Sequence, residues 1–174
     1  MIEQARANVL VLQQGAALLR RIDDQVYRCN LETMNVNSVG AHVRHNLDHY
    51  LSFFVGLKSG TIDYDARERD TLLEIDREAA LSVTEVVCRY LLDLTNPACA
   101  KILRICCNSE QGTRRATSSI TRELDFLLSH TIHHYAIIAV LCRLQNVKVE
   151  PDFGVAPSTL RYQSTSKMQC ATND

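Results

Sequence analysis

The chain has 174 residues, of which 46% are hydrophobic and 22% are charged, so its length and composition predict one soluble globular domain with a substantial core. Its formal net charge of -1, from 19 basic and 20 acidic residues, disfavours nucleic acid and anionic membrane surfaces as partners. The first residues lack a secretion-signal pattern, and no apolar run approaches the roughly 20 residues of a membrane span, so we expect a cytoplasmic protein.

Two amphipathic helices are predicted in the first third of the chain. Apolar residues recur at helical spacing over residues 2–26, and again from about Ser38 to Lys58. Asn35, Asn37 and Ser38 are candidate N-caps for the second helix, and Gly60 is its expected end.

The second predicted helix carries three histidines along one edge of its apolar stripe. His42, His45 and His49 are spaced three and four residues apart, which places them on the same side of a helix. One interpretation is a solvated polar edge shared with Arg44 and Asp48. The other is part of a metal site that a facing helix completes, since neutral imidazole is the commonest protein metal ligand.

A charge-rich segment separates the second helix from the third. Residues 61–76 read TIDYDARERDTLLEID and show no period, which predicts a loop that crosses over the helices. Asp63 and Asp65 in this loop are more typical of solvated carboxylates than of catalytic groups. Asp76 is a candidate N-cap for a third helix that reaches about Leu94.

The next segment changes its period toward two. The runs CAKILRICC and TRRATS, separated by NSEQG, predict a short β-hairpin or two extended segments. Seven cysteines occur in the chain without a CxxC spacing, so neither a disulfide framework nor a thiolate zinc site is indicated. Cys106 and Cys107 are the adjacent pair that would permit a redox role, although free cysteines are commonly buried apolar residues.

The last long helix is predicted from Ser118 or Ser119 to about Leu144, and it contains the run LLSHTIHHYAIIAVLC. At about 100° per residue, His130 and His134 fall on the buried apolar stripe of this run and His133 falls on its flank. The following DFGVAPSTLRY has enough apolar residues to pack back on the helices. Residues 166–174 are polar and are expected to be disordered, so the predicted domain covers residues 1–165.

These segments resemble the DinB-like family of small metal-binding helical proteins, also called YfiT-like metalloenzymes, which is distinct from the DNA polymerase of that name. In SVGAHVRHNLDH, His45 matches the family histidine of the pattern S-[IV]-x-x-x-x-x-H. In HTIHHYAII, His130 and His134 match the first and last histidines of the family segment H-x-x-H-H. A subset of the family is also similar in IDYDARERD, SHTIHHYA and FGVAPSTLRY.

The resemblance implies an all-α fold, a four-helix bundle of DinB/YfiT-like topology, with the short extended or β-hairpin segment between its third and fourth helices. It also implies a divalent metal, usually zinc or nickel, held by His45, His130 and His134. Relatives of this kind include thiol S-transferases, a maleylpyruvate isomerase and a domain of ergothioneine-forming enzymes. Three protein ligands leave a position open for water or substrate, and a zinc ion lowers the pKa of bound water toward about 7.

Other residues are expected near this metal. Glu123 precedes His130 by seven residues on the same helix face, about 10 Å along the axis, and is a candidate catalytic base or a residue that orients a ligand. The alternative is that Glu123 merely interacts with the dipole of the helix N-terminus. The further candidates for supporting or pocket positions are His42, His49, His133, Asp48 and Tyr64.

Three functional hypotheses follow. The leading one is a metal-dependent enzyme of hydrolase or thiol S-transferase type that acts on a small molecule, with thiols as one class of substrate. The second is a non-catalytic metal-binding or interaction module, in which the metal clamps the bundle or the bundle pairs with another copy as a homodimer. The third is a metal-free helical protein with polar core histidines. Fold analogy alone does not decide among them.

Overall fold

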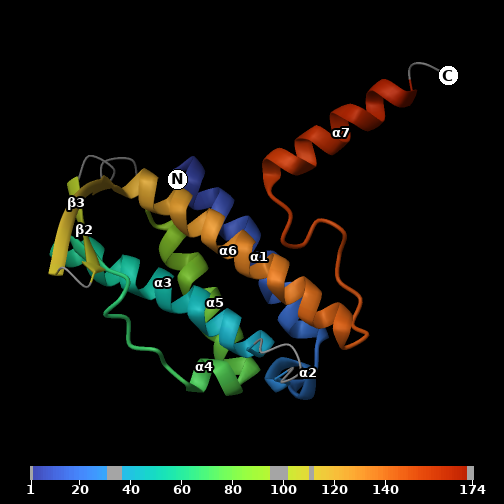
Figure 1. Cartoon of the computed structure of the whole chain (residues 1–174), viewed down its shortest axis with the longest axis horizontal. Helices are drawn as coiled ribbons and strands as arrows, with labels where there is room; N and C mark the ends of the chain where they lie inside the picture. The colour runs from blue at the N-terminus through green and yellow to red at the C-terminus, as the bar shows by residue number, and fades with distance from the viewer. Residues whose placement is uncertain (1, 31–36, 95–101, 110–111, 172–174) are drawn as a thin grey trace.

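Four long helices form the body of the protein. The structure is a computed structural model that describes residues 2–30, 37–94, 102–109 and 112–171, except for the side chains of residues 108–109 and 166–171. Within these residues it has seven helices and three strands. The long helices pack against one another as shown in Figure 1 and are α1 (Glu3–Arg21), α3 (Val39–Ser59), α5 (Arg77–Leu92) and α6 (Ile120–Leu144).

The ends of the two histidine-bearing helices follow local sequence signals. The Ser38 side chain accepts a hydrogen bond from the backbone N–H of Ala41, and α3 ends at Gly60, whose φ of 80° suits a residue without Cβ. The Ser119 side chain likewise accepts a bond from the backbone N–H of Arg122 at the start of α6. These caps confirm the predicted starts of both helices.

A buried polar chain fixes α3 against α6. The Asn8 amide of α1 donates to the carbonyl of Leu124, 2.9 Å away, and the Tyr50 hydroxyl of α3 donates to Asn8 Oδ1 at 2.6 Å. Tyr50 also lies 3.0 Å from the hydroxyl of Thr131 on α6. Since buried polar groups are costly without partners, these bonds favour one arrangement of the three helices.

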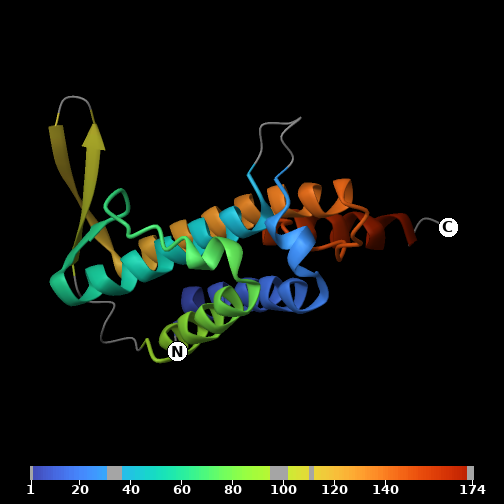
Figure 2. The same ribbon diagram turned by 90° about the horizontal axis from the view of Figure 1, so that it is seen from below.

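The predicted all-α four-helix bundle is wrong, because a three-stranded mixed sheet stands at one end of the helices (Figure 2). In this sheet, β1 (Thr61–Asp63) pairs in parallel with β2 (Ile102–Ser109), and β2 pairs in antiparallel fashion with β3 (Gly112–Ser119). The extended segments predicted before the last long helix form β2 and β3. Residues 99–101 and 110–111 of that prediction, like the candidate N-cap Asn35, lie outside the described part of the chain.

β1 lies where the sequence predicts only a crossing loop. Ile62 of β1 is fully buried and pairs with Ile105 of β2. A Cβ atom on Gly56 of α3 would lie 2.3 Å from Ile62 Cγ1, so glycine at this position lets the strand approach the helix closely. The pairing joins segments about 40 residues apart, which the periodicity of either segment cannot reveal.

Three shorter or peripheral helices complete the described chain. α2 (Asp24–Arg28) begins at the N-cap Asp23, so the first predicted helix is broken before residue 26. α4 (Leu72–Ile75) lies within the segment predicted as a loop, and that prediction is therefore also wrong there. α7 (Pro157–Ala171) extends away from the other helices (Figure 1) and continues into the segment predicted to be disordered.

The segment before α7 packs back on the helices through one aromatic residue. Phe153 is buried and stacks on Tyr135 of α6, with ring centroids 4.7 Å apart. Tyr162 on α7 is 74% exposed. The predicted return of this apolar segment is therefore confirmed for Phe153, whereas Tyr162 is largely exposed.

The described cysteines are free thiols, namely Cys29, Cys88, Cys106, Cys107 and Cys142. Burial raises the pKa of the Cys88 and Cys142 thiols to about 11, which makes both poor nucleophiles at neutral pH. Cys106 and Cys107 are half-buried on β2.

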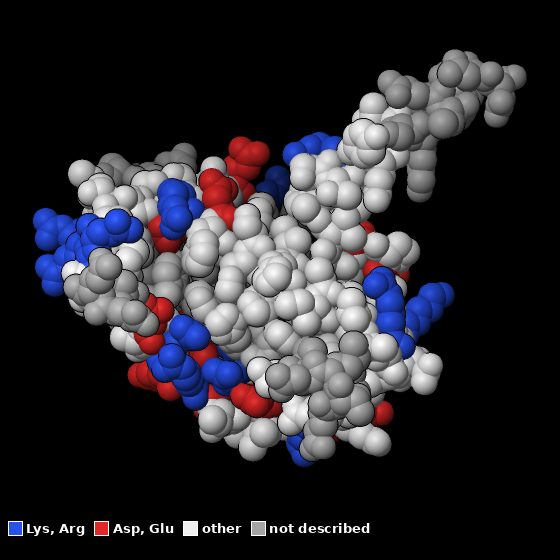
Figure 3. Space-filling view, in the orientation of Figure 1, with Lys and Arg blue, Asp and Glu red and all other residues white. Residues whose placement is uncertain are grey.

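Charges of both signs are interspersed on the face shown in Figure 3, and Lys and Arg side chains gather at the end that carries β2 and β3. Arg114 and Arg115 of β3 are exposed there. By length and composition, α6 is the one helix of the described chain that could cross a membrane. A core helix meets the same criteria, and α6 packs against α1 and α3.

Candidate metal centre

Two neighbouring helices bring the six histidines of the chain together, three from α3 and three from α6. The ring centroid of His45 lies 5.0 Å from that of His130 and 4.6 Å from that of His134. The rings of His49 and His130 are 4.3 Å apart. The histidines of the two helices therefore face each other, as one interpretation of the sequence predicts.

Three of these histidines are close enough to hold a metal ion. His45, His49 and His130 each offer one ring nitrogen, and these nitrogens all lie within 4.8 Å of one another. The Nδ1–H of His49 donates to the backbone carbonyl of His45 at 2.8 Å, which leaves the lone pair of neutral His49 on Nε2. His130 Nε2 is buried without a hydrogen-bond partner among the described residues. Both features fit a metal-binding group.

His134, which the family resemblance implies as the third ligand, lies beside this group. Its Nδ1 is 2.9 Å from Nδ1 of His42, so one of the two rings donates to the other. Its ring is 4.6 Å from the rings of both His45 and His130. The ligand set His45, His130 and His134 thus stays a prediction. His49, placed by the sequence among the supporting residues, is the histidine that the geometry groups with His45 and His130.

Burial lowers the pKa of five of the histidines, which favours their neutral form. Burial is the main cause that lowers the pKa of His45 to about 3, of His130 to about 4 and of His134 to about 3. Neighbouring histidines lower all three values further, and burial also lowers the pKa of His42 and His49. A neutral imidazole has the lone pair that a metal requires, so these side chains are ready ligands at neutral pH.

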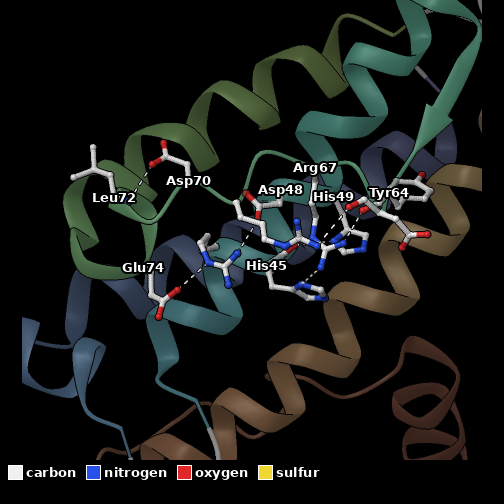
Figure 4. Close-up of polar contacts among 11 residues, drawn as sticks. His45, Asp48, His49, Tyr64, Arg67, Asp70, Leu72 and Glu74 are labelled. Atoms are coloured by element: carbon white, nitrogen blue, oxygen red, sulfur yellow. Dashed lines mark hydrogen bonds and ion pairs between the residues drawn. The ribbon is translucent and has the colours of Figure 1, made fainter. Parts of the chain in front are cut away.

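Arg67, from the segment after β1, reaches toward His45 (Figure 4). Its Nη2 lies 3.4 Å from His45 Nδ1, a long contact in which the guanidinium is the donor. Its Nη1 donates to the backbone carbonyl of Tyr64 at 2.6 Å. Sequence reasoning missed Arg67, because its position depends on the tertiary fold of a segment without a period.

Asp48, a predicted partner for a ligand imidazole, pairs with an arginine instead. Arg44 Nη1 lies 2.9 Å from Asp48 Oδ2, and Arg44 Nε lies 2.9 Å from Glu74 Oε2 (Figure 4). Burial raises the pKa of Asp48, while the Arg44 charge and hydrogen bond act in the opposite direction. This network ties α3 to α4 beside the histidines.

Tyr64 packs against His49 and is hydrogen-bonded to Glu123. The Tyr64 hydroxyl donates to Glu123 Oε2 at 2.9 Å, and the Tyr64 ring stacks on His49 with centroids 5.3 Å apart. Glu123 is fully buried, and its Oε1 accepts bonds from Ser118 Oγ at 2.5 Å and Arg122 Nη1 at 2.7 Å. Its carboxylate therefore positions Tyr64, and through that ring it supports His49.

Phe126 of α6 also contacts the histidines, which the sequence did not indicate. Its ring stacks on His130, with centroids 5.6 Å apart, and lies 5.2 Å from the Tyr64 ring. His133 is exposed, and its ring is 5.2 Å from that of His134. The helical spacing that places His133 on the flank of the stripe predicts this exposure.

Comparison with known proteins yields one partial similarity. No protein family matches the chain, and no solved structure matches it. FK506-binding protein 5 of Rhizopus delemar is 32% identical to the chain over 106 residues, which cover 58% of this chain. The chain spans 27% of that protein's length. A similarity of this extent leaves the family of the chain open.

Proposed function

We propose that the chain is a metal-dependent enzyme of hydrolase or thiol S-transferase type, related to the DinB-like proteins, that acts on a small molecule in the cytoplasm. The observation that carries this proposal is the histidine group of α3 and α6, in which nitrogens of His45, His49 and His130 lie within 4.8 Å of one another. Three protein ligands with further positions open are typical of catalytic zinc sites, whereas structural zinc sites have four.

The donor set indicates the kind of metal. Imidazole nitrogens suit zinc, nickel and copper, whereas calcium and magnesium prefer oxygen ligands, and no carboxylate belongs to the group. Of these ions we propose zinc and nickel, which the family resemblance implies. A divalent ion of this kind supplies a Lewis acid, which lowers the pKa of a water or thiol that binds beside the histidines.

The residues around the histidines include aromatic rings and a cation that could contact a small molecule. The Tyr64 and Phe126 rings pack on His49 and His130, so they shield the ligand nitrogens from water. Arg67 brings a guanidinium to His45. These groups would hold and orient a substrate next to the metal.

The alternative is a metal that clamps helices without turnover. This alternative is favoured because the proposed ligands come from two helices: His45 and His49 belong to α3, and His130 belongs to α6. A metal that joins two helices would stabilise the fold in proportion to its affinity for the folded chain. The same ligand set thus serves both functions, and activity separates them.

The test begins with metal-loaded protein assayed for thiol transfer and amide hydrolysis. Activity that is lost in His45→Ala and retained in His133→Ala supports an enzyme, since His133 is an exposed histidine of the same cluster. Metal binding that raises the unfolding temperature without detectable turnover on either substrate class would favour the clamp. Wild-type protein that takes up neither zinc nor nickel would exclude both.

A further inference from the structure

Arg67 introduces a positive charge beside the histidines, and the carboxylates of Asp48 and Asp65 act on it only from a distance. Throughout the described residues, no carboxylate oxygen lies within ion-pair distance of its guanidinium. Arg44, the residue before His45 on α3, does form such ion pairs. It pairs with both Asp48 and Glu74, each at 2.9 Å. The contrast identifies Arg67 as the cation of this region whose charge remains available.

The hydrogen bonds of Arg67 leave one edge of its guanidinium incomplete. Nη1 is engaged by the Tyr64 carbonyl at 2.6 Å, whereas Nη2 has only the 3.4 Å contact with His45 Nδ1. Nε is buried and has no hydrogen-bond partner in the described structure. Nε and Nη2 form one edge of the planar guanidinium, which is the edge that two oxygens of a carboxylate fit.

The histidine group adds no negative charge to balance this cation. Its three members are imidazoles, and a divalent ion bound among them would keep its full charge. The nearest buried carboxylates are already engaged, Asp48 by Arg44 and Glu123 by Tyr64 and Arg122. Arg67 therefore keeps a guanidinium edge without a directly paired carboxylate, and an anionic ligand would complete it.

We propose that the site binds a small carboxylate, with its two oxygens on the Nε and Nη2 edge of Arg67 and the rest of the molecule beside the Tyr64 and Phe126 rings. This assignment rests on the proposed function, because it names the substrate class of the same site. A guanidinium edge offers two parallel donors to a carboxylate or a phosphate alike, and the carboxylate is favoured because the surrounding aromatic rings suit an organic acid better than inorganic phosphate. The adjacent rings favour a ligand with a flat apolar part.

The experiment follows ligand binding to protein loaded with cobalt(II) by calorimetry, which detects binding at Arg67 whether or not the ligand touches the metal. Benzoate, acetate and inorganic phosphate are titrated separately into wild type, Arg67→Gln and Arg69→Gln. Arg69 is the matched control, since it is exposed and its Nη2 bonds the Asp65 carbonyl. We expect benzoate to bind more tightly than acetate, and Arg67→Gln to weaken benzoate about tenfold or more, as expected for a lost bidentate ion pair. Arg69→Gln should change the affinity much less.

Three further measurements keep the outcome decisive. Arg67→Gln should retain cobalt binding, because the substitution removes a positive charge next to the ligands. Arg67→Lys should recover part of the benzoate affinity, since lysine keeps the charge but not the planar fork. Benzoate binding to metal-free protein, followed by calorimetry, should also depend on Arg67. That titration decides the carboxylate assignment even if the protein binds no metal.

Equal benzoate affinity in wild type and Arg67→Gln would overturn the proposal. So would tighter binding of phosphate than of benzoate, or a wild-type protein that responds to neither carboxylate.

Discussion

His49 donates its Nδ1 proton to the backbone carbonyl of His45, one turn earlier on α3, over a distance of 2.8 Å. This bond fixes the tautomer of His49 and leaves its lone pair on Nε2. On α6, Nε2 of His130 is buried without a hydrogen-bond partner in the part of the chain that is described. Two helices thus present imidazoles that need no rearrangement of the helices to share a metal ion.

The first prediction concerns the third ligand. If His49 completes the group with His45 and His130, then His49→Ala should weaken zinc binding more than the roughly 10–100-fold that follows the loss of an outer partner. His134→Ala should stay within that range, because Nδ1 of His134 lies 2.9 Å from Nδ1 of His42. Competition with a chromogenic chelator measures both affinities. The reverse order would show that His134 is the ligand, as the family resemblance implies.

The second prediction concerns the pH dependence of stability in metal-free protein. Burial lowers the pKa of His45 and His134 to about 3 and of His130 to about 4, from 6.5 in the unfolded chain. Below pH 6.5 the unfolded chain therefore binds more protons than the folded chain at these sites. The free energy of unfolding should fall as the pH is lowered from about 7.5 to about 5.5.

Urea denaturation at a series of pH values measures this effect. The double variant His45→Gln, His130→Gln removes two of the shifted groups, so it should show a shallower pH dependence than wild type. A wild-type stability that is constant between these pH values would contradict the account. Metal-loaded protein is the companion sample, since proton competition for the imidazoles should make its metal affinity fall in the same direction.

The third prediction separates a positioning role of Glu123 from a catalytic one. Its buried carboxylate accepts bonds from Tyr64, Ser118 and Arg122. Hydrogen bonds to a charged group contribute about 1.5–3 kcal/mol each before screening, so Glu123→Gln should lower the free energy of unfolding by about 2 kcal/mol. Tyr64→Phe removes one of these donors and should cost less, about 1 kcal/mol.

Chemical denaturation and turnover assays on the same variants test this assignment. A positioning role predicts that Tyr64→Phe and Glu123→Gln alter activity in parallel, because both disturb the ring that stacks on His49. Unchanged stability in Glu123→Gln together with complete loss of turnover, while Tyr64→Phe stays active, would instead identify Glu123 as the catalytic base.

The elements that the sequence predicts well are those whose signals are local. The spacing of His42, His45 and His49 places them on one side of α3, and the serine caps of α3 and α6 act on backbone groups within three residues. β1 is different. Its three residues pair with β2 and pack on Gly56, so its strand conformation depends on contacts made after the chain has folded.

The same distinction between local signals and tertiary contacts applies to the candidate site. Histidines on two apolar stripes are visible in the sequence, because helix periodicity alone determines which side they occupy. The choice between His49 and His134 depends on side-chain rotamers and on the way α3 lies against α6. Tyr64 and Arg67 follow β1 on a segment without a period, so only the folded chain shows that they reach the histidines.

The most direct measurement of the central claim is the metal content of purified protein after incubation with zinc or nickel and removal of free ion. Mass spectrometry of native protein and elemental analysis should both give one ion per wild-type chain. The double variant His45→Ala, His130→Ala should give none, because these two histidines belong to both ligand sets considered above, while His133→Ala should match wild type. A wild-type chain without bound metal, or a double variant that retains it, would contradict the account.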